Sequence, residues 1–157
     1  MWYMIPVTVT VDVPQKREDV FAHLDVLANH EAFTDHFLVD WRLEGPASGV
    51  GASVTMRVRA PGRSGEVELT VIEAEPPVRT VEETVGAGGR RRTRGTYTLE
   101  AVDADRTEVR FEIEPLEVPR SERPLWPLSR AWLRRQNARS LERLREQLEG
   151  QPAQAAA

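Results

Sequence analysis

An acidic pair, Glu82 and Glu83, lies in the strand-like stretch TVEETV. Successive side chains of a strand point to opposite faces, so Glu83 shares the face of the apolar Val81 and Val85. A carboxyl group that faces an apolar interior has a raised pKa and can act as a general acid or base. We therefore expect Glu83 to face an internal site and Glu82 to point away from it. The alternative is that Glu83 is solvated near the open end of the sheet or pairs with an arginine.

The strand after the glycine-rich loop GAGG would leave room beside that carboxyl group. If Tyr97 pairs with Val81 across the hairpin, Gly95 lies opposite Glu83. Glycine has no side chain, so space remains beside the carboxylate. A bulge at Gly95 would change this pairing.

A polar residue interrupts the apolar face of the last helical segment, Arg130–Leu148. Helical spacing places Asn137 on the same stripe as Leu133 and Leu141. A buried amide needs hydrogen-bond partners, and in a ligand-binding role Asn137 would orient a carbonyl or hydroxyl group. The alternative is that Asn137 binds a strand carbonyl or a trapped water.

Two histidines, His30 and His36, flank the stretch EAFTD. Their spacing matches no metal-binding signature, since HEAFT is not H-E-x-x-H, so no metal site is expected. The functional interpretation places the pair at the mouth of a cavity, with Phe33 as a lid and His36 as a hydrogen-bonding group.

The composition is that of an ordinary globular domain. The 157 residues are 40% hydrophobic and 29% charged, and the net charge of −4 argues against a general nucleic-acid binder. No apolar run reaches about 18 residues, so no integral membrane segment is expected. Cysteine is absent, which removes thiolate chemistry and suits a cytoplasmic location. We expect one domain over 1–150 and a disordered tail over 151–157, and the sequence leaves a homodimer open.

Two further motifs have plain interpretations. The connector GVGAS precedes a strand and not a helix N-terminus, so it is not a dinucleotide site, and no cofactor is expected. Four arginines on the hairpin tip GGRRRTRG could meet an anionic partner. The arginines of the last helix alternate with glutamates at three- and four-residue spacing, which is typical of a solvated, ion-paired face.

The elements that must position these residues follow from hydrophobic spacing. The stretch IPVTVTVDV alternates strictly and predicts a half-buried strand, and helical spacing follows over 15–30 with a short helix or turn over 30–37. Turn signals separate the later strands at intervals of about ten residues, as in an antiparallel meander. These strands are expected at 37–43, 53–60, 66–75, 80–85, 92–101 and 107–116. A long helix is expected over 122–149.

This pattern resembles the START-like, or SRPBCC, superfamily, in particular small bacterial members of the polyketide cyclase/dehydrase type. Three segments carry the resemblance: the opening strand and helix over 7–33, the strands and glycine connector over 39–58, and the closing helix over 129–150. It implies an α+β helix-grip fold, in which a curved antiparallel sheet wraps around the long C-terminal helix and leaves a cavity. Members bind hydrophobic or amphipathic small molecules there. They share no catalytic motif, so the resemblance assigns no catalytic residue.

We therefore expect a hydrophobic or amphipathic small molecule to bind between sheet and helix. The expected contact residues are Phe33, Trp41, Met56, Glu83, Tyr97 and Asn137. One alternative is a cyclase or dehydratase acting on an aromatic polyketide-like substrate, with Glu83 or His36 moving protons. Asn137 and Tyr97 would then hold oxygens. A second alternative is an interaction module that uses the arginine-rich surface, and the sequence does not decide whether the protein is an enzyme.

Overall fold

Seven strands form one antiparallel sheet in the computed structural model, which describes residues 5–150. The strands are β1 (Val7–Val13), β2 (Leu38–Glu44), β3 (Ser53–Ala60), β4 (Arg63–Glu75), β5 (Arg79–Gly86), β6 (Arg91–Asp103) and β7 (Arg106–Glu117). Their order across the sheet is β1-β7-β6-β5-β4-β3-β2, so six consecutive strands form a meander and β1 pairs with the last of them. The strands expected from the sequence are all present. The tail expected over 151–157 lies outside the described residues.

The helical segments lie between β1 and β2, in the β5–β6 hairpin and after β7. They are α1 (Arg17–Asp25), the 3₁₀ turn η1 (Leu27–His30), α2 (Glu31–Thr34), the 3₁₀ turns η2 (Ala87–Gly89) and η3 (Arg120–Leu125), and α3 (Trp126–Glu149). The helix expected over 122–149 divides at Trp126, because Pro124 lies in the 3₁₀ turn before it. Pro127 lies in the first turn of α3, where a missing backbone N–H costs no hydrogen bond.

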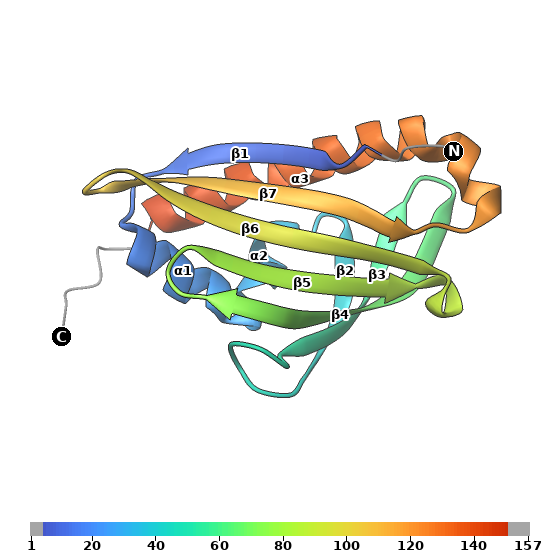
Figure 1. Cartoon of the computed structure of the whole chain (residues 1–157), viewed down its shortest axis with the longest axis horizontal. Coiled ribbons are helices and arrows are strands. Elements are labelled where there is room, and N and C mark those ends of the chain that lie inside the picture. The colour runs from blue at the N-terminus through green and yellow to red at the C-terminus, as the bar shows by residue number, and fades with distance from the viewer. Residues whose placement is uncertain (1–4, 151–157) are drawn as a thin grey trace.

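Helix α3 lies along one face of the curved sheet, next to β1 (Figure 1). The alternating valines of β1 face it, and Val7, Val9, Val11 and Val13 are all buried. Val9, Val11 and Val13 belong to a core that α1 and the C-terminal half of α3 complete. This arrangement confirms the predicted helix-grip fold, because the sheet wraps around the helix and buries its apolar stripe.

A second apolar cluster lies farther along the sheet, on β3 and β4. It contains Leu27, Ala52, Val54, Met56, Val67, Leu69 and Val71, with Leu38, Trp41 and Val58 packed against it. The two clusters therefore cover different parts of the sheet, and residues of both line a cavity beneath α3.

The register of the β5–β6 hairpin corrects the prediction for the acidic pair. Thr80, and not Val81, pairs with Tyr97, so Gly95 faces Glu82. A shift of one residue reverses the face of every side chain in a strand. Glu82 therefore points to the α3 side of the sheet and Glu83 to the other side. The loop over 86–90, with positive φ at Ala87, Gly88 and Gly89, determines this register.

Candidate functional site

A cavity of about 700 Å³ lies between the sheet and the N-terminal half of α3. Apolar side chains from β3, β4, β7 and α3 form most of its wall. They are Phe37, Leu38, Met56, Val58, Val67, Leu69, Phe111, Ile113, Val118, Trp126, Trp132 and Leu133. The ring of Trp132 meets Phe37 edge-on, with centroids 5.8 Å apart, so the helix and the segment after α2 contact each other at the side of the cavity.

Three connections lie at one end of the cavity and form its mouth. They are the β3–β4 turn, the loop around η2, and the link from β7 to η3, which lie together at one end of the sheet (Figure 1). An ion pair between Arg91 and Glu122 joins two of these connections, with a second contact of 3.2 Å from Arg91 Nε to Glu122 Oε2. The cavity therefore opens toward a charged rim, while its interior is mainly apolar.

Glu82 is the acidic group of the cavity wall. Its side chain is only 8% exposed, and burial raises the pKa of its carboxyl group to about 8. Within the described part of the chain, no group hydrogen-bonds this carboxyl. A Cβ atom on Gly95 would lie 3.0 Å from Glu82 Oε1 and 3.0 Å from the ring of Phe111. Glycine at position 95 therefore allows the Glu82 carboxyl group to lie close against β6, and this carboxyl group is protonated at neutral pH.

Two polar groups of α3 also line the cavity. The Asn137 amide donates a hydrogen bond of 2.8 Å to the backbone oxygen of Leu133, one turn back in the same helix. Its side-chain oxygen has no such bond to the described residues. The indole N–H of Trp126 is buried without a partner among the described groups. The amide oxygen of Asn137 and the indole N–H of Trp126 are therefore polar groups of the lining that lack a partner among the described residues.

The structure brings two of the expected contact residues, Met56 and Asn137, to the cavity wall. Phe33 is fully buried in the core, so the expectation that it forms a lid over the cavity is wrong. Tyr97 also lies in the core, where it stacks on Phe111 with ring centroids 4.3 Å apart. Burial, and then the nearby Glu82, raises the pKa of Tyr97 well above its usual value.

Trp41 and Glu83 lie away from the main cavity. The indole of Trp41 donates a hydrogen bond of 3.0 Å to the backbone oxygen of Leu38, and its ring borders a separate shallow recess. Glu83 accepts a hydrogen bond of 2.7 Å from Arg92. The alternative of an arginine partner for Glu83 is therefore the one observed, and Glu82 takes the internal position expected for its neighbour.

The two histidines connect helices and do not line the cavity. The His36 Nε2–H donates to the backbone oxygen of Gln136 at 3.1 Å, and its Nδ1 accepts a hydrogen bond of 2.7 Å from Arg143. Burial lowers the pKa of His36, and the Arg143 charge lowers it further. His30 is buried, contacts the backbone oxygen of Leu24 at 2.7 Å, and has a pKa lowered to about 4, mainly by burial.

The described residues contain no group of three His, Cys, Asp or Glu side chains that could hold a metal ion. None of their helices is long and apolar enough to cross a membrane.

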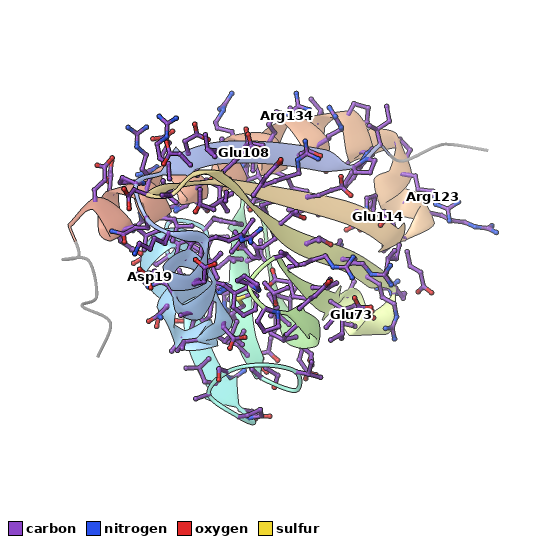
Figure 2. The ribbon with its side chains drawn as sticks, turned by 60° about the vertical axis from the view of Figure 1, so that its left-hand side comes forward. Asp19, Glu73, Glu108, Glu114, Arg123 and Arg134 are labelled. Atoms are coloured by element: carbon purple, nitrogen blue, oxygen red, sulfur yellow. The ribbon has the colours of Figure 1, made fainter. Side chains whose placement is uncertain are left out.

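Three of the four hairpin arginines, Arg90, Arg91 and Arg92, have partners among the described residues. Arg92 contacts Glu83 and, at 3.9 Å, Glu117, while Arg90 bonds the backbone oxygen of Ala87. An anionic partner would compete with these contacts. On η3 and α3, Arg123 and Arg134 are exposed and extend from the outer side of the molecule (Figure 2).

Two glycine features of the sequence, the loop between β5 and β6 and Gly95, indicate that Glu82 points inward, whereas the hydrophobic alternation of β5 does not. The glycine loop between β5 and β6 decides the hairpin register, and Gly95 is the residue that leaves space beside a carboxyl group. Pairing by apolar phase selects Val81 and Val85 as inward residues. In the structure the inward positions of β5 hold Glu82 and Thr84, which line the cavity.

Comparison with known proteins places the chain in a family. The chain belongs to the family described as polyketide cyclase / dehydrase and lipid transport, whose sequence pattern matches residues 4–149. It is a member of the START-like superfamily, as the resemblance predicted. Among curated proteins, none matches the sequence.

Solved structures share the fold. The protein TTHA0849 from Thermus thermophilus matches with a TM-score of 0.74 at 16% identity, over 92% of this chain and 97% of that one. The Zhui aromatase/cyclase from Streptomyces sp. R1128 matches with a TM-score of 0.70 at 16% identity, over 94% of both chains. A START superfamily protein from Mycobacterium smegmatis has a TM-score of 0.68 at 16% identity, over 91% of this chain and 98% of that one. At this identity the likeness establishes the helix-grip architecture.

Proposed function

We propose that this protein binds a hydrophobic or amphipathic small molecule in the cavity between the sheet and α3. The observation that carries the proposal is a cavity of about 700 Å³ whose wall is mainly apolar and includes a few polar groups. Pockets for small molecules in proteins span about 300–1,000 Å³ and have the same mixture of apolar wall and sparse polar contacts. The family description supports the proposal, because cyclisation, dehydration and lipid transport each require a site for a largely apolar molecule.

The experiment compares two leucine variants of α3. Leu133 lines the cavity, whereas Leu128 is 71% exposed on the same helix. Native mass spectrometry with lipid and aromatic metabolite libraries should detect bound molecules in the wild type. Leu133→Trp should weaken binding about tenfold or more, because the larger side chain enters the cavity. Leu128→Trp should leave binding unchanged.

Thermal unfolding serves as the fold control for both variants. A ligand at about 100 times its Kd should stabilise the wild type by about 2.7 kcal/mol. Equal binding by the two tryptophan variants, or no binding by the wild type to either library, would contradict the proposal.

A second candidate function, a cyclase or dehydratase, is favoured by Glu82. A carboxyl group with a pKa of about 8 can donate or accept a proton near neutral pH, and this one faces the cavity. We would test the wild type, Glu82→Gln and Glu83→Gln on 4-hydroxy-4-phenylbutan-2-one, whose dehydration to an enone is followed by absorbance. The enzyme hypothesis expects turnover by the wild type and Glu83→Gln only. Absence of turnover in the wild type counts against dehydration of this class of hydroxyketone.

A further inference from the structure

We propose that Glu82 is the polar anchor of the cavity and donates a hydrogen bond from its carboxyl group to a ketone or quinone oxygen of the bound molecule. This inference rests on the proposed function and deepens it, because it names the chemical group that an otherwise apolar ligand must present.

The geometry of the Glu82 carboxyl is that of a binding group without its partner. The side chain lines the cavity, is 8% exposed, and has no hydrogen bond to the described groups. A buried polar group without a partner costs about 1–3 kcal/mol, so a ligand that supplies one recovers free energy on binding. In a cavity with this lining, an oxygen on an apolar skeleton supplies that partner.

Gly95 allows this carboxyl group to lie close against the neighbouring strand β6. It lies directly across the strand pair from Glu82 and itself lines the cavity. Any side chain at this position would meet both Glu82 Oε1 and the Phe111 ring at 3.0 Å. Glu82 and Phe111 both line the cavity, so a ligand that accepts a hydrogen bond from the carboxyl group also lies near an aromatic ring.

The charges around Glu82 favour a neutral acceptor over an anion or a cation. On neighbouring strands it faces Val71, Gly95 and the phenol of Tyr97. Helix α3 contributes the uncharged side chain of Asn137 to the cavity wall. The cation Arg91 at the mouth is already paired with Glu122.

The protonation state agrees with the donor role. Burial raises the pKa of Glu82 to about 8, so at pH 7 the carboxyl group carries a proton that it can donate. Tyr97 titrates at higher pH, and His30, whose ring lies 5.6 Å from that of Tyr97, titrates near pH 4. Between about pH 7 and 9, Glu82 is therefore the group of this cluster that changes charge.

The test uses three probes with one skeleton: 2-acetylnaphthalene, 2-ethylnaphthalene and 1-(2-naphthyl)ethylamine. They carry a ketone, a methylene and an amine at the same position, and equilibrium dialysis at pH 7 measures their Kd. One neutral hydrogen bond is worth about 0.5–1.5 kcal/mol, so the wild type should prefer the ketone over the hydrocarbon by about two- to tenfold. Glu82→Leu should abolish this preference and leave hydrocarbon binding intact. Glu82→Gln keeps a donor and should retain the preference in part.

Glu83→Leu is the matched control, because Glu83 lies on the same strand but points to the opposite face and pairs with Arg92. It should bind all three probes as the wild type does. A second readout is pH: ketone affinity of the wild type should fall as the pH rises through about 8, and Glu82→Gln should show no such fall. A structural role for Glu82 would alter the melting temperature without altering the order of probe affinities.

Three outcomes would overturn the inference, and they separate it from the proposed function. Equal affinity of the wild type for the ketone and the hydrocarbon removes the anchor but leaves a hydrophobic binding site. Tighter binding of the amine than the ketone assigns Glu82 to cationic ligands instead. Failure of all three probes to bind the wild type argues against the proposed function and the anchor together.

Discussion

The two halves of α3 meet the same sheet in different ways. The C-terminal half buries Leu141, Leu144 and Leu148 in a filled core. The N-terminal half presents Trp132 and Leu133 to a cavity of about 700 Å³. One helix therefore serves as a packed element at one end and as the wall of a cavity at the other.

The segment between β1 and β2 accounts for the difference. At the filled end, α1 inserts Val20, Phe21 and Leu24 beside the helix, and Phe33 completes the core. At the cavity end, no helix of the described chain takes this place, and the sheet presents small residues such as Gly95. The comparison teaches that the space under α3 depends on which elements are inserted beside it and not on the helix alone.

The largest expected effect comes from truncating the same residue type in the two halves. Leu144 is 0% exposed, so Leu144→Ala should destabilise the protein by about 2–5 kcal/mol, because it leaves a void in a filled core. Leu133→Ala should cost less than half as much, since Leu133 already borders empty space. Urea unfolding followed by circular dichroism measures both. Equal costs would break the distinction between the filled and the open end.

The pH dependence of stability gives a second comparison, between Glu82 at the cavity and His30 in the filled core. The folded pKa of Glu82 is about 8 against an ordinary value of 4.5, so the folded state holds the extra proton in between and stability falls as pH rises through that window. The folded pKa of His30 is about 4 against an ordinary 6.5, so it makes stability rise with pH between those values.

Below pH 6.5 the contributions of Glu82 and His30 to the pH dependence of stability have opposite signs. Above pH 6.5 only the contribution of Glu82 remains of these two. From about pH 6.5 to 8 the free energy of unfolding should fall by about 2 kcal/mol, at about 1.4 kcal/mol per pH unit. Glu82→Gln should remove this slope. A wild-type curve that stays level over this range would show that Glu82 is ionised and the cavity polar.

Adding a methyl group beside Glu82 tests how tightly the cavity wall is packed at this point. Gly95→Ala places a Cβ atom 3.0 Å from Glu82 Oε1 and from Phe111. The overpacking costs about 1–3 kcal/mol, and the gain in strand propensity offsets about 0.5–1 kcal/mol of it. We expect a net loss of about 1–2 kcal/mol in thermal unfolding. Gly65→Ala, near the start of β4 with no atom within 4 Å of the added Cβ, is the control.

The smallest expected effect concerns the surface contact that attaches α2 to α3. Arg143 and Asp35 lie 2.6 Å apart with partly exposed side chains. Surface ion pairs contribute about 0–1 kcal/mol, so Asp35→Asn should lower stability by less than about 1 kcal/mol in urea unfolding. A larger loss would mean that ion pairs, and not the packed core, hold α2 in place.

The fold could be predicted almost completely from the sequence, because its signals are local. The alternation of β1 and the turn residues between strands determine where each strand begins and ends. The apolar stripe that ends at Leu148 requires a surface to cover. The candidate site could be predicted only in part, since Met56 and Asn137 line the cavity while Phe33 and Tyr97 lie in the core. Hydrophobic residues on an inward face can border a cavity or fill it, and the local pattern is the same in both cases.

The sequence by itself determined the order of elements, the antiparallel sheet and the helix that lies across it, since periodicity and turn chemistry act over a few residues. It also contained the glycine that leaves space beside a carboxyl group. Only the tertiary structure decided which carboxyl group occupies that space. The physical reason is that hairpin register depends on how the glycine loop closes, and a shift of one residue exchanged Glu83 for Glu82 on the cavity side.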